Sequence, residues 1–178
     1  MTKKVLRDRP IARSVEHRFE FLSELFMKSK GQPIEIDGEA IHAMFSLSFS
    51  PGKHLLEVRK ISFKPALHPG LAFRIKDGSM LIAGQKLERF NLWAESSPEV
   101  AQVLITARKN CRLNVWNIWS VNGATDAWVG QAGMKISTCA MTSELACSGG
   151  STVRDFGCLV VELEQMEAPD DDRLGTEV

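Results

Sequence analysis

The residues of this sequence best suited to binding chemistry are tryptophans that lie close together in the chain. Trp116, Trp119 and Trp128 are three of its four tryptophans. Broad indole rings can stack on the apolar face of a sugar or of another planar ligand. Asn117 and Asp126 would then supply directional hydrogen bonds. On this interpretation the ligand-binding residues are Asn117, Trp119, Asp126 and Trp128, and the ligand is a sugar or another small polar molecule.

A second interpretation places the same tryptophans in a hydrophobic core. In an extended strand over residues 113–119, alternate side chains point to opposite faces. Both faces are then partly apolar, which is typical of a strand covered on both sides. An amphipathic helix elsewhere in the chain would cover the second face. The sequence favours this core interpretation, and it leaves Asn117 and the Asp126–Trp128 segment as the positions where binding is expected.

The histidines lack the spacing of a catalytic or metal-binding motif. His42, His54 and His68 lie outside any HExxH pattern. If they converged in space, they would suit a metal-dependent hydrolase, and that enzyme alternative stays open. The scattered carboxylates do not form a recognisable glycosidase pair. We therefore expect no catalytic residue, no bound metal and no cofactor.

The cysteines give no sign of a zinc site or of a disulfide framework. Cys111, Cys139, Cys147 and Cys158 form no CxxC pair, and no histidine follows them at zinc-finger spacing. No apolar segment of a secretory signal follows the basic residues at the start of the chain. We therefore expect a cytoplasmic location and free thiols.

The overall charge does not favour a polyanionic partner. The 22 lysines and arginines balance the 22 aspartates and glutamates, so the formal net charge is zero. The basic N-terminal segment lacks interleaved aromatic residues, and the chain lacks an RNP-like motif. No run of about 18 apolar residues is present. We therefore expect neither a nucleic-acid partner nor a membrane.

One amphipathic helix is predicted over residues 14–30. The apolar residues that recur there at helical spacing are Val15, Phe19, Leu22, Leu25 and Phe26. Ser14 is a suitable N-cap, and Gly31 is a suitable C-terminal stop. The helix needs a surface to cover, and the two ends of the chain carry opposite charges. These features together predict a homo-oligomer.

From residue 34 onward, alternation with a period of two predicts about nine or ten short strands, which indicates an all-β sandwich or barrel. Of these two, we expect an antiparallel β-sandwich. A switch in the inward-facing positions predicts a β-bulge near Arg59-Lys60. Asp77-Gly78 predicts a two-residue hairpin turn. Residues 139–155 are small and polar, and they are expected to be mostly loop.

The domain organisation follows from these elements. A basic lead-in covers residues 1–13, and a single domain with its N-terminal helix covers residues 14–166. An acidic tail over residues 167–178 is expected to be disordered.

Four segments in the middle of the chain resemble an uncharacterised family of small bacterial proteins. They are residues 80–85, 92–94, 115–119 and 127–134, within a likeness that covers roughly residues 55–165. The resemblance implies a jelly-roll sandwich similar to galactose-binding-like domains, and it implies no activity. Near the end of the chain Asp155 matches the family pattern. Gly149, Gly157 and Cys158 stand where acidic residues would be expected.

The function predicted from the sequence is therefore that of a non-catalytic binding or interaction module. The alternatives are a carbohydrate-binding domain that uses Asn117, Trp119, Asp126 and Trp128, and the metal-dependent hydrolase described above. The burial of the tryptophans would distinguish the first two.

Overall fold

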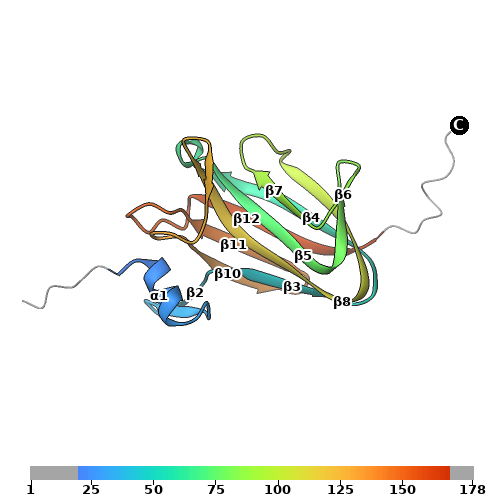
Figure 1. Ribbon diagram of the computed structural model, residues 1–178, viewed down its shortest axis with the longest axis horizontal. Helices are drawn as coiled ribbons and strands as arrows, with labels where there is room; N and C mark the ends of the chain where they lie inside the picture. Colours follow the sequence, from blue (N-terminus) through green and yellow to red (C-terminus); the bar gives the residue numbers. More distant parts are fainter. Residues whose placement is uncertain (1–19, 169–178) are drawn as a thin grey trace, which may run out of the picture.

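The computed structural model describes residues 20–168 and is mostly antiparallel β-sheet with one short α-helix (Figure 1). The first half of this range contains α1 (Leu22–Lys28), β1 (Ile34–Ile36), β2 (Glu39–His42), β3 (Phe45–Phe49), β4 (Gly52–Phe63), a 3-10 turn (Pro65–Leu67) and β5 (Pro69–Ile82). The second half contains β6 (Gln85–Leu87), β7 (Arg89–Trp93), β8 (Val100–Val121), β9 (Ala124–Asp126), β10 (Gly133–Cys139), β11 (Thr142–Ser148) and β12 (Leu159–Glu167). The predicted all-β antiparallel class with one helix is confirmed. Within residues 20–168 no helix is long and apolar enough to cross a membrane.

Strand β8 is the centre of the sheet because it pairs along both of its edges. Strands β3 and β4 follow one edge in succession, and β5 follows the other. Beyond β4 the sheet continues through β12, β11, β10, β2 and β1. Beyond β5 it continues through β7 and β6. The tryptophan segment predicted over residues 113–119 is therefore the second half of the most extensively paired strand.

The predicted hairpin at Asp77-Gly78 is wrong, because β5 runs through these residues without turning back. Lys76 lies opposite Arg112, and Gly78 lies opposite Ala107. Residues 108–111 of β8 therefore lie opposite Asp77 alone, so the pairing of the two strands is interrupted here by an enlarged β-bulge. A Cβ on Gly78 would come within 2.9 Å of neighbouring atoms. Glycine is needed here for close packing of the strands rather than for a turn.

Hairpin turns occur where two consecutive residues adopt positive φ. Ala83 and Gly84, between β5 and β6, have φ values of 47° and 75°. Asn122 and Gly123, between β8 and β9, have φ values of 51° and 81° and confirm the turn expected from this Asn-Gly pair. The predicted bulge near Arg59-Lys60 is also confirmed, since Ile61 is left without a partner where the register of β12 shifts.

The prediction that residues 139–155 are mostly loop is wrong. Residues 142–148 form β11, an inner strand that pairs with β10 on one edge and β12 on the other. Its inward-facing side chains Ser143, Leu145 and Cys147 are all buried. Two of these three are small, which hid the alternation in the sequence. A strand with small inner side chains still forms when it is paired on both edges.

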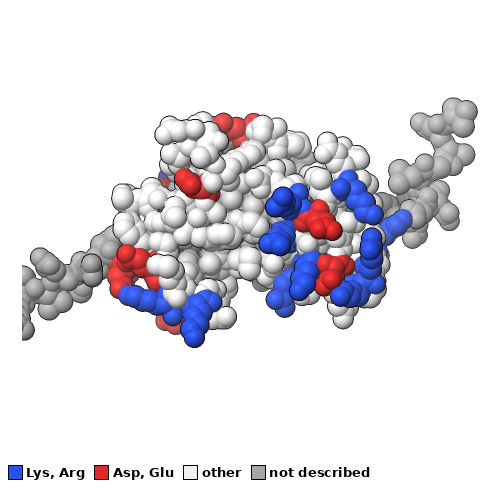
Figure 2. All heavy atoms as spheres, viewed as in Figure 1, with Lys and Arg blue, Asp and Glu red and all other residues white. Residues whose placement is uncertain are grey.

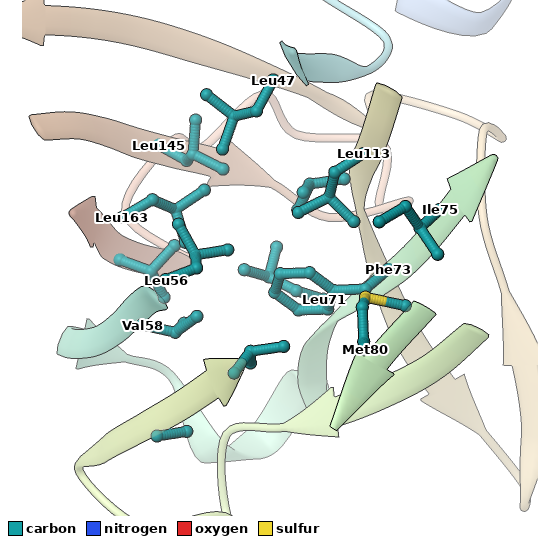
Figure 3. Packing of buried hydrophobic residues seen from close by; sticks show 14 of the residues in the cluster. Leu47, Leu56, Val58, Leu71, Phe73, Ile75, Met80, Leu113, Leu145 and Leu163 are labelled. Atoms are coloured by element: carbon teal, nitrogen blue, oxygen red, sulfur yellow. The ribbon is translucent and has the colours of Figure 1, made fainter. Parts of the chain in front are cut away.

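The hydrophobic core lies between the two halves of this sheet. Leu145 and Leu163, from β11 and β12, belong to the same buried cluster as Leu71 and Phe73 of β5 and Leu113 of β8 (Figure 3). Side chains on one face of β5 and β8 therefore point into the core. The opposite face of these two strands points outward.

Helix α1 does not cover the second face of the tryptophan strand, and that expectation is corrected. Its buried residues Leu22 and Phe26 pack against Ile41 of β2 in a separate small cluster. A Cβ on Gly133 of β10 would come within 2.9 Å of Leu22, so the helix sits directly on β10. The predicted stop is confirmed, because Gly31 has a φ of 77° and its N–H donates to Phe26 O at 2.8 Å. The predicted start of the helix, within residues 14–30, is wrong, because α1 begins at Leu22 and its N-cap residue Phe21 is extended, with a φ of -74° and a ψ of 147°. The predicted lead-in, Ser14 and the acidic tail beyond residue 168 lie outside the described residues.

Candidate functional site

Two of the residues predicted to bind a ligand lie inside the protein. The side chain of Asn117 is 3% exposed, and its Nδ2 donates a 2.7 Å hydrogen bond to Ser148 O. Trp119 is 7% exposed and lies against Gly150, where an added Cβ would come within 1.9 Å of the indole. Both side chains point inward from β8 and connect it to the segment that follows β11. The structure therefore gives Asn117 and Trp119 a role in packing.

The other two predicted residues lie nearer the surface. Trp128 is 49% exposed and stacks on Trp116, with ring centroids 5.2 Å apart and an interplanar angle of 28°. Its Nε1 donates to Ala43 O at 3.2 Å. Asp126 ends β9 and is half-buried opposite Trp119. The four predicted residues therefore do not share one surface. The aromatic pair on the surface is Trp116 with Trp128.

The outward-facing side of β3, β8, β5 and β7 forms a polar sheet surface, which we call the outer face. Cross-strand pairing sets its side chains in rows: Trp116, Ala72 and Asn91; Asn114, Arg74 and Arg89; Arg112 and Lys76; and the neighbours Ser46 and Ser48 on β3. Ser46 Oγ donates to Asn114 Oδ1 at 2.8 Å. The face therefore changes along the strands from an aromatic end at Trp116 to a basic end at Arg112.

Three hollows follow each other along the outer face. The first, about 500 Å³, is lined by Trp116, Ala72, Arg74, Arg89 and Asn91 together with Phe73 and Phe90. The second, about 630 Å³, shares Arg74 and Arg89 with the first. The third, about 580 Å³, shares Lys76 and Asn114 with the second. Because neighbouring hollows share residues, they lie side by side along the outer face, and we call this row of hollows the trough.

The cations of the outer face lack acidic partners. Within residues 20–168, Arg74, Lys76, Arg89 and Arg112 are all exposed, and none forms an ion pair. Several charged side chains elsewhere are paired: Lys28 with Glu20, Lys64 with Asp155, and Lys135 with Glu39. Two carboxylates, Asp77 and Glu88, also line the second hollow, and Asp77 pairs with Lys109 at 3.1 Å. The outer face of this neutral protein therefore carries an excess of positive charge.

Figure 2 shows the same asymmetry on the molecular surface. Lysines and arginines gather toward one end of this view, over β5, β6 and β8, around two small acidic spots. The middle of the view is almost free of charge. The sequence analysis did not find this group, because its members come from three separate segments. Their outward positions were visible in the alternation, but the register that makes them neighbours was not.

Of the histidines within residues 20–168, His42, His54 and His68 do not come together in a site. His42 is on β2, His54 is on β4, and His68 precedes β5, where its Nδ1 lies 3.1 Å from Glu95 Oε2. Burial lowers the pKa of His42 from its ordinary value, which favours the neutral imidazole. In the part of the chain that the structure describes, no group of three or more His, Cys, Asp or Glu residues is arranged to hold a metal.

The four cysteines are free thiols, and three of them are buried. Cys111, Cys147 and Cys158 are buried, and Cys139 is exposed. Burial raises the pKa of Cys111, Cys147 and Cys158, so each stays protonated at neutral pH. Cys111 is the one that lines a hollow of the outer face, and its raised pKa makes it unsuited to catalysis.

Asp155, the carboxylate that matches the family pattern, is engaged within the fold. Its Oδ2 pairs with Lys64, and its Oδ1 accepts the N–H of Gly157 at 2.9 Å. The Lys64 hydrogen bond, the Gly157 N–H and the Lys64 charge together lower the pKa of Asp155. These contacts fix the loop before β12 and leave no cluster of carboxylates around Asp155.

Comparisons with protein-family models, with curated proteins and with solved structures find no match. The resemblance to a family of small bacterial jelly-roll proteins therefore stays a prediction.

Proposed function

We propose that the protein is a non-catalytic binding module, and that the outer face of β3, β8, β5 and β7 is its binding surface for an anionic partner. The observation that carries this proposal is the pairing of like charges across the strands. Arg74 is the direct partner of Arg89, and Lys76 is the direct partner of Arg112.

Such pairs are unfavourable for the fold itself. Like charges directly opposite each other in a sheet are destabilising, by about 0.2–1 kcal/mol per pair. Neither pair forms an ion pair with an acidic residue within residues 20–168, although Asp77 and Glu88 line the same hollow. A bound anion would neutralise both pairs at once. The trough beside them provides space for it.

The arginine and lysine side chains of the outer face can bind anionic groups in different ways. The planar guanidinium groups of Arg74, Arg89 and Arg112 can each donate two parallel hydrogen bonds to a phosphate or carboxylate. Lys76 adds a point charge. Serine and asparagine side chains between the cations can donate further hydrogen bonds. The surface is therefore suited to a ligand with several anionic groups.

The carbohydrate-binding alternative is supported only by the exposed indole of Trp128 on Trp116. Asn117, its expected polar partner, already donates to Ser148 O in the interior. The hydrolase alternative has weaker support, since His42, His54 and His68 lie on different strands or loops. The jelly-roll arrangement, the galactose-binding-like relationship, the cytoplasmic location and the homo-oligomer stay predictions.

Titration with inorganic polyphosphate at low salt tests the proposed function. The natural chain should bind, and Arg74→Gln/Arg89→Gln should weaken binding about tenfold or more, since each arginine contributes charge-assisted hydrogen bonds. Lys28→Gln/Lys30→Gln, which removes the same charge at the α1 end, is the matched control and should bind like the natural chain. Absence of binding, or equal loss in both double variants, would refute the proposal.

A further inference from the structure

Trp116 lies at the uncharged end of the outer face and lines the hollow that contains Arg74 and Arg89. Its cross-strand partner is Ala72, whose side chain is too small to cover an indole ring. Trp128 stacks on the indole but is not among the residues that line the hollow. The indole of Trp116 is half-buried and packs against the hydrophobic core, and its remaining surface contacts Trp128 and borders the hollow beside the two arginines.

Trp128 is held in a backbone conformation that bulky residues rarely adopt. Its φ is 56°, in the left-handed region, which persists only where the surrounding structure enforces it. The hydrogen bond from Nε1 to Ala43 O fixes the orientation of the ring, and yet half of the side chain is exposed. A strained and exposed tryptophan contributes little to a core. It does enlarge the aromatic surface that begins at Trp116.

An aromatic surface beside a groove of positive charge is the combination that binds single-stranded nucleic acids. Along β8, Trp116 and Arg112 are four residues apart, which is about 13 Å in an extended strand. Arg74 and Arg89 lie between them on the neighbouring strands. We propose that the partner of the outer face is a single-stranded nucleic acid, with a base stacked on Trp116 and adjacent phosphates on the cations. This inference rests on the anion-binding function proposed above.

The polar residues between the aromatic and basic ends support a single strand over a duplex. Asn91 and Asn114 carry amide groups that can both donate and accept hydrogen bonds. Exposed base edges of an unpaired strand offer matching groups, whereas a duplex hides its base faces and presents mainly phosphates.

This inference departs from the expectation that the chain has no nucleic-acid partner. That expectation rested on the zero net charge, on the missing RNP-like motif and on an N-terminal segment without aromatic residues. Folding places Trp116 next to arginines that are 27 and 42 residues away in the sequence, at positions 89 and 74. The interleaving of aromatic and basic residues is a property of the sheet and not of any one segment.

The test compares four probes in fluorescence titrations. They are oligo(dT) and oligo(U) of about 12 nucleotides, within the site size typical of a small domain, a DNA duplex of the same length, and inorganic polyphosphate. Both single strands should bind more tightly than the duplex and should quench tryptophan fluorescence. Trp116→Leu should weaken single-strand binding about tenfold or more, the effect expected from the loss of one stacking contact, and should leave polyphosphate binding unchanged. If either single strand binds more tightly than the duplex, the proposal is supported. The tighter of the two single strands then shows whether the partner is DNA or RNA.

Control variants distinguish a loss of base stacking from a loss of protein stability. Phe156→Leu removes an aromatic ring near α1 and should change no affinity, and Trp128→Asn replaces the strained residue by one that tolerates positive φ. If Trp116→Leu fails to fold, two other measurements test the inference. They are the quenching of tryptophan fluorescence in the natural chain and the titration of Trp128→Asn with the same four probes. If all four probes bind alike and neither tryptophan variant discriminates among them, the nucleic-acid inference is overturned while the anion-binding function survives. If polyphosphate and the oligonucleotides all fail to bind, both proposals are overturned.

Discussion

Arg74 on β5 and Arg89 on β7 are direct cross-strand partners, and both side chains are exposed on the same face of the sheet. This arrangement concentrates positive charge beside Trp116, and we expect it to lower the stability of the folded state. A destabilising pair at the surface indicates a function, because surface residues that serve only the fold could be replaced by more favourable ones.

Arg89→Glu should make the protein more stable and weaken its binding of anions. The substitution replaces a repulsive pair by an attractive one, with an expected gain of about 0.5 kcal/mol in the free energy of unfolding. Urea denaturation measures the gain. In a protein that already carries Arg74→Gln, Arg89→Glu should raise the free energy of unfolding by less. The difference between the two gains measures the interaction between residues 74 and 89. A loss of stability in Arg89→Glu would show that the pair is not repulsive.

Gly150→Ala should destabilise the fold strongly. The added Cβ would come within 1.9 Å of the buried indole of Trp119, which has no room to move. Overpacking of this kind costs about 1–3 kcal/mol and occasionally more. Gly149→Ala is the matched control, since its Cβ would meet nothing closer than 3.9 Å. Equal melting temperatures for the two variants would contradict the described packing of Trp119.

Asn117→Ala should lower the free energy of unfolding by about 1–3 kcal/mol, because the carbonyl of Ser148 would lose its buried hydrogen-bond donor. Ser46→Ala removes an exposed hydrogen bond to Asn114 and should change stability by less than about 0.5 kcal/mol. Urea denaturation of both variants gives the comparison. If Asn117 served only to bind a ligand, Asn117→Ala would keep its stability.

The pairing of Asp155 with Lys64 predicts a dependence of stability on pH. The pKa of Asp155 is lowered in the folded state, so the unfolded chain binds the proton more readily. The stabilisation is fully present above the unfolded pKa of about 3.9 and is lost as the pH falls through the lower folded value. The melting temperature of the natural chain should therefore exceed that of Asp155→Asn at pH 6, and the difference should shrink in acid. A constant difference over that range would contradict the assignment.

The sequence was a good guide to features that depend on local periodicity. Ile41, Leu47 and Phe49 face inward as their alternation predicted, and Gly31 ends the helix as its type predicted. These outcomes follow from the side-chain period of a strand and from the conformational freedom of glycine. Neither depends on which strand becomes a neighbour.

The features that the sequence did not predict depend on pairing between distant strands. Asp77-Gly78 has the composition of a hairpin turn, and Asp77 does have a φ of 66°, but the irregular pairing with β8 lets β5 continue through these residues. Ser143 and Cys147 look like loop residues, but pairing on both edges makes β11 an inner strand. The outer face belongs to the same class, because register alone brings Arg74 and Arg89 together.

The central claim, that the outer face is the binding surface, is tested most directly by mapping the amide chemical shifts of the ¹⁵N-labelled protein during titration with inorganic polyphosphate. We predict shifts concentrated in residues 72–76, 89–91 and 112–116, which lie on three neighbouring strands of that face. Residues 22–28 of α1 should stay unchanged, since the helix packs on β2 and β10 instead. Shifts confined to α1, or no shifts at all at low salt, would contradict the account.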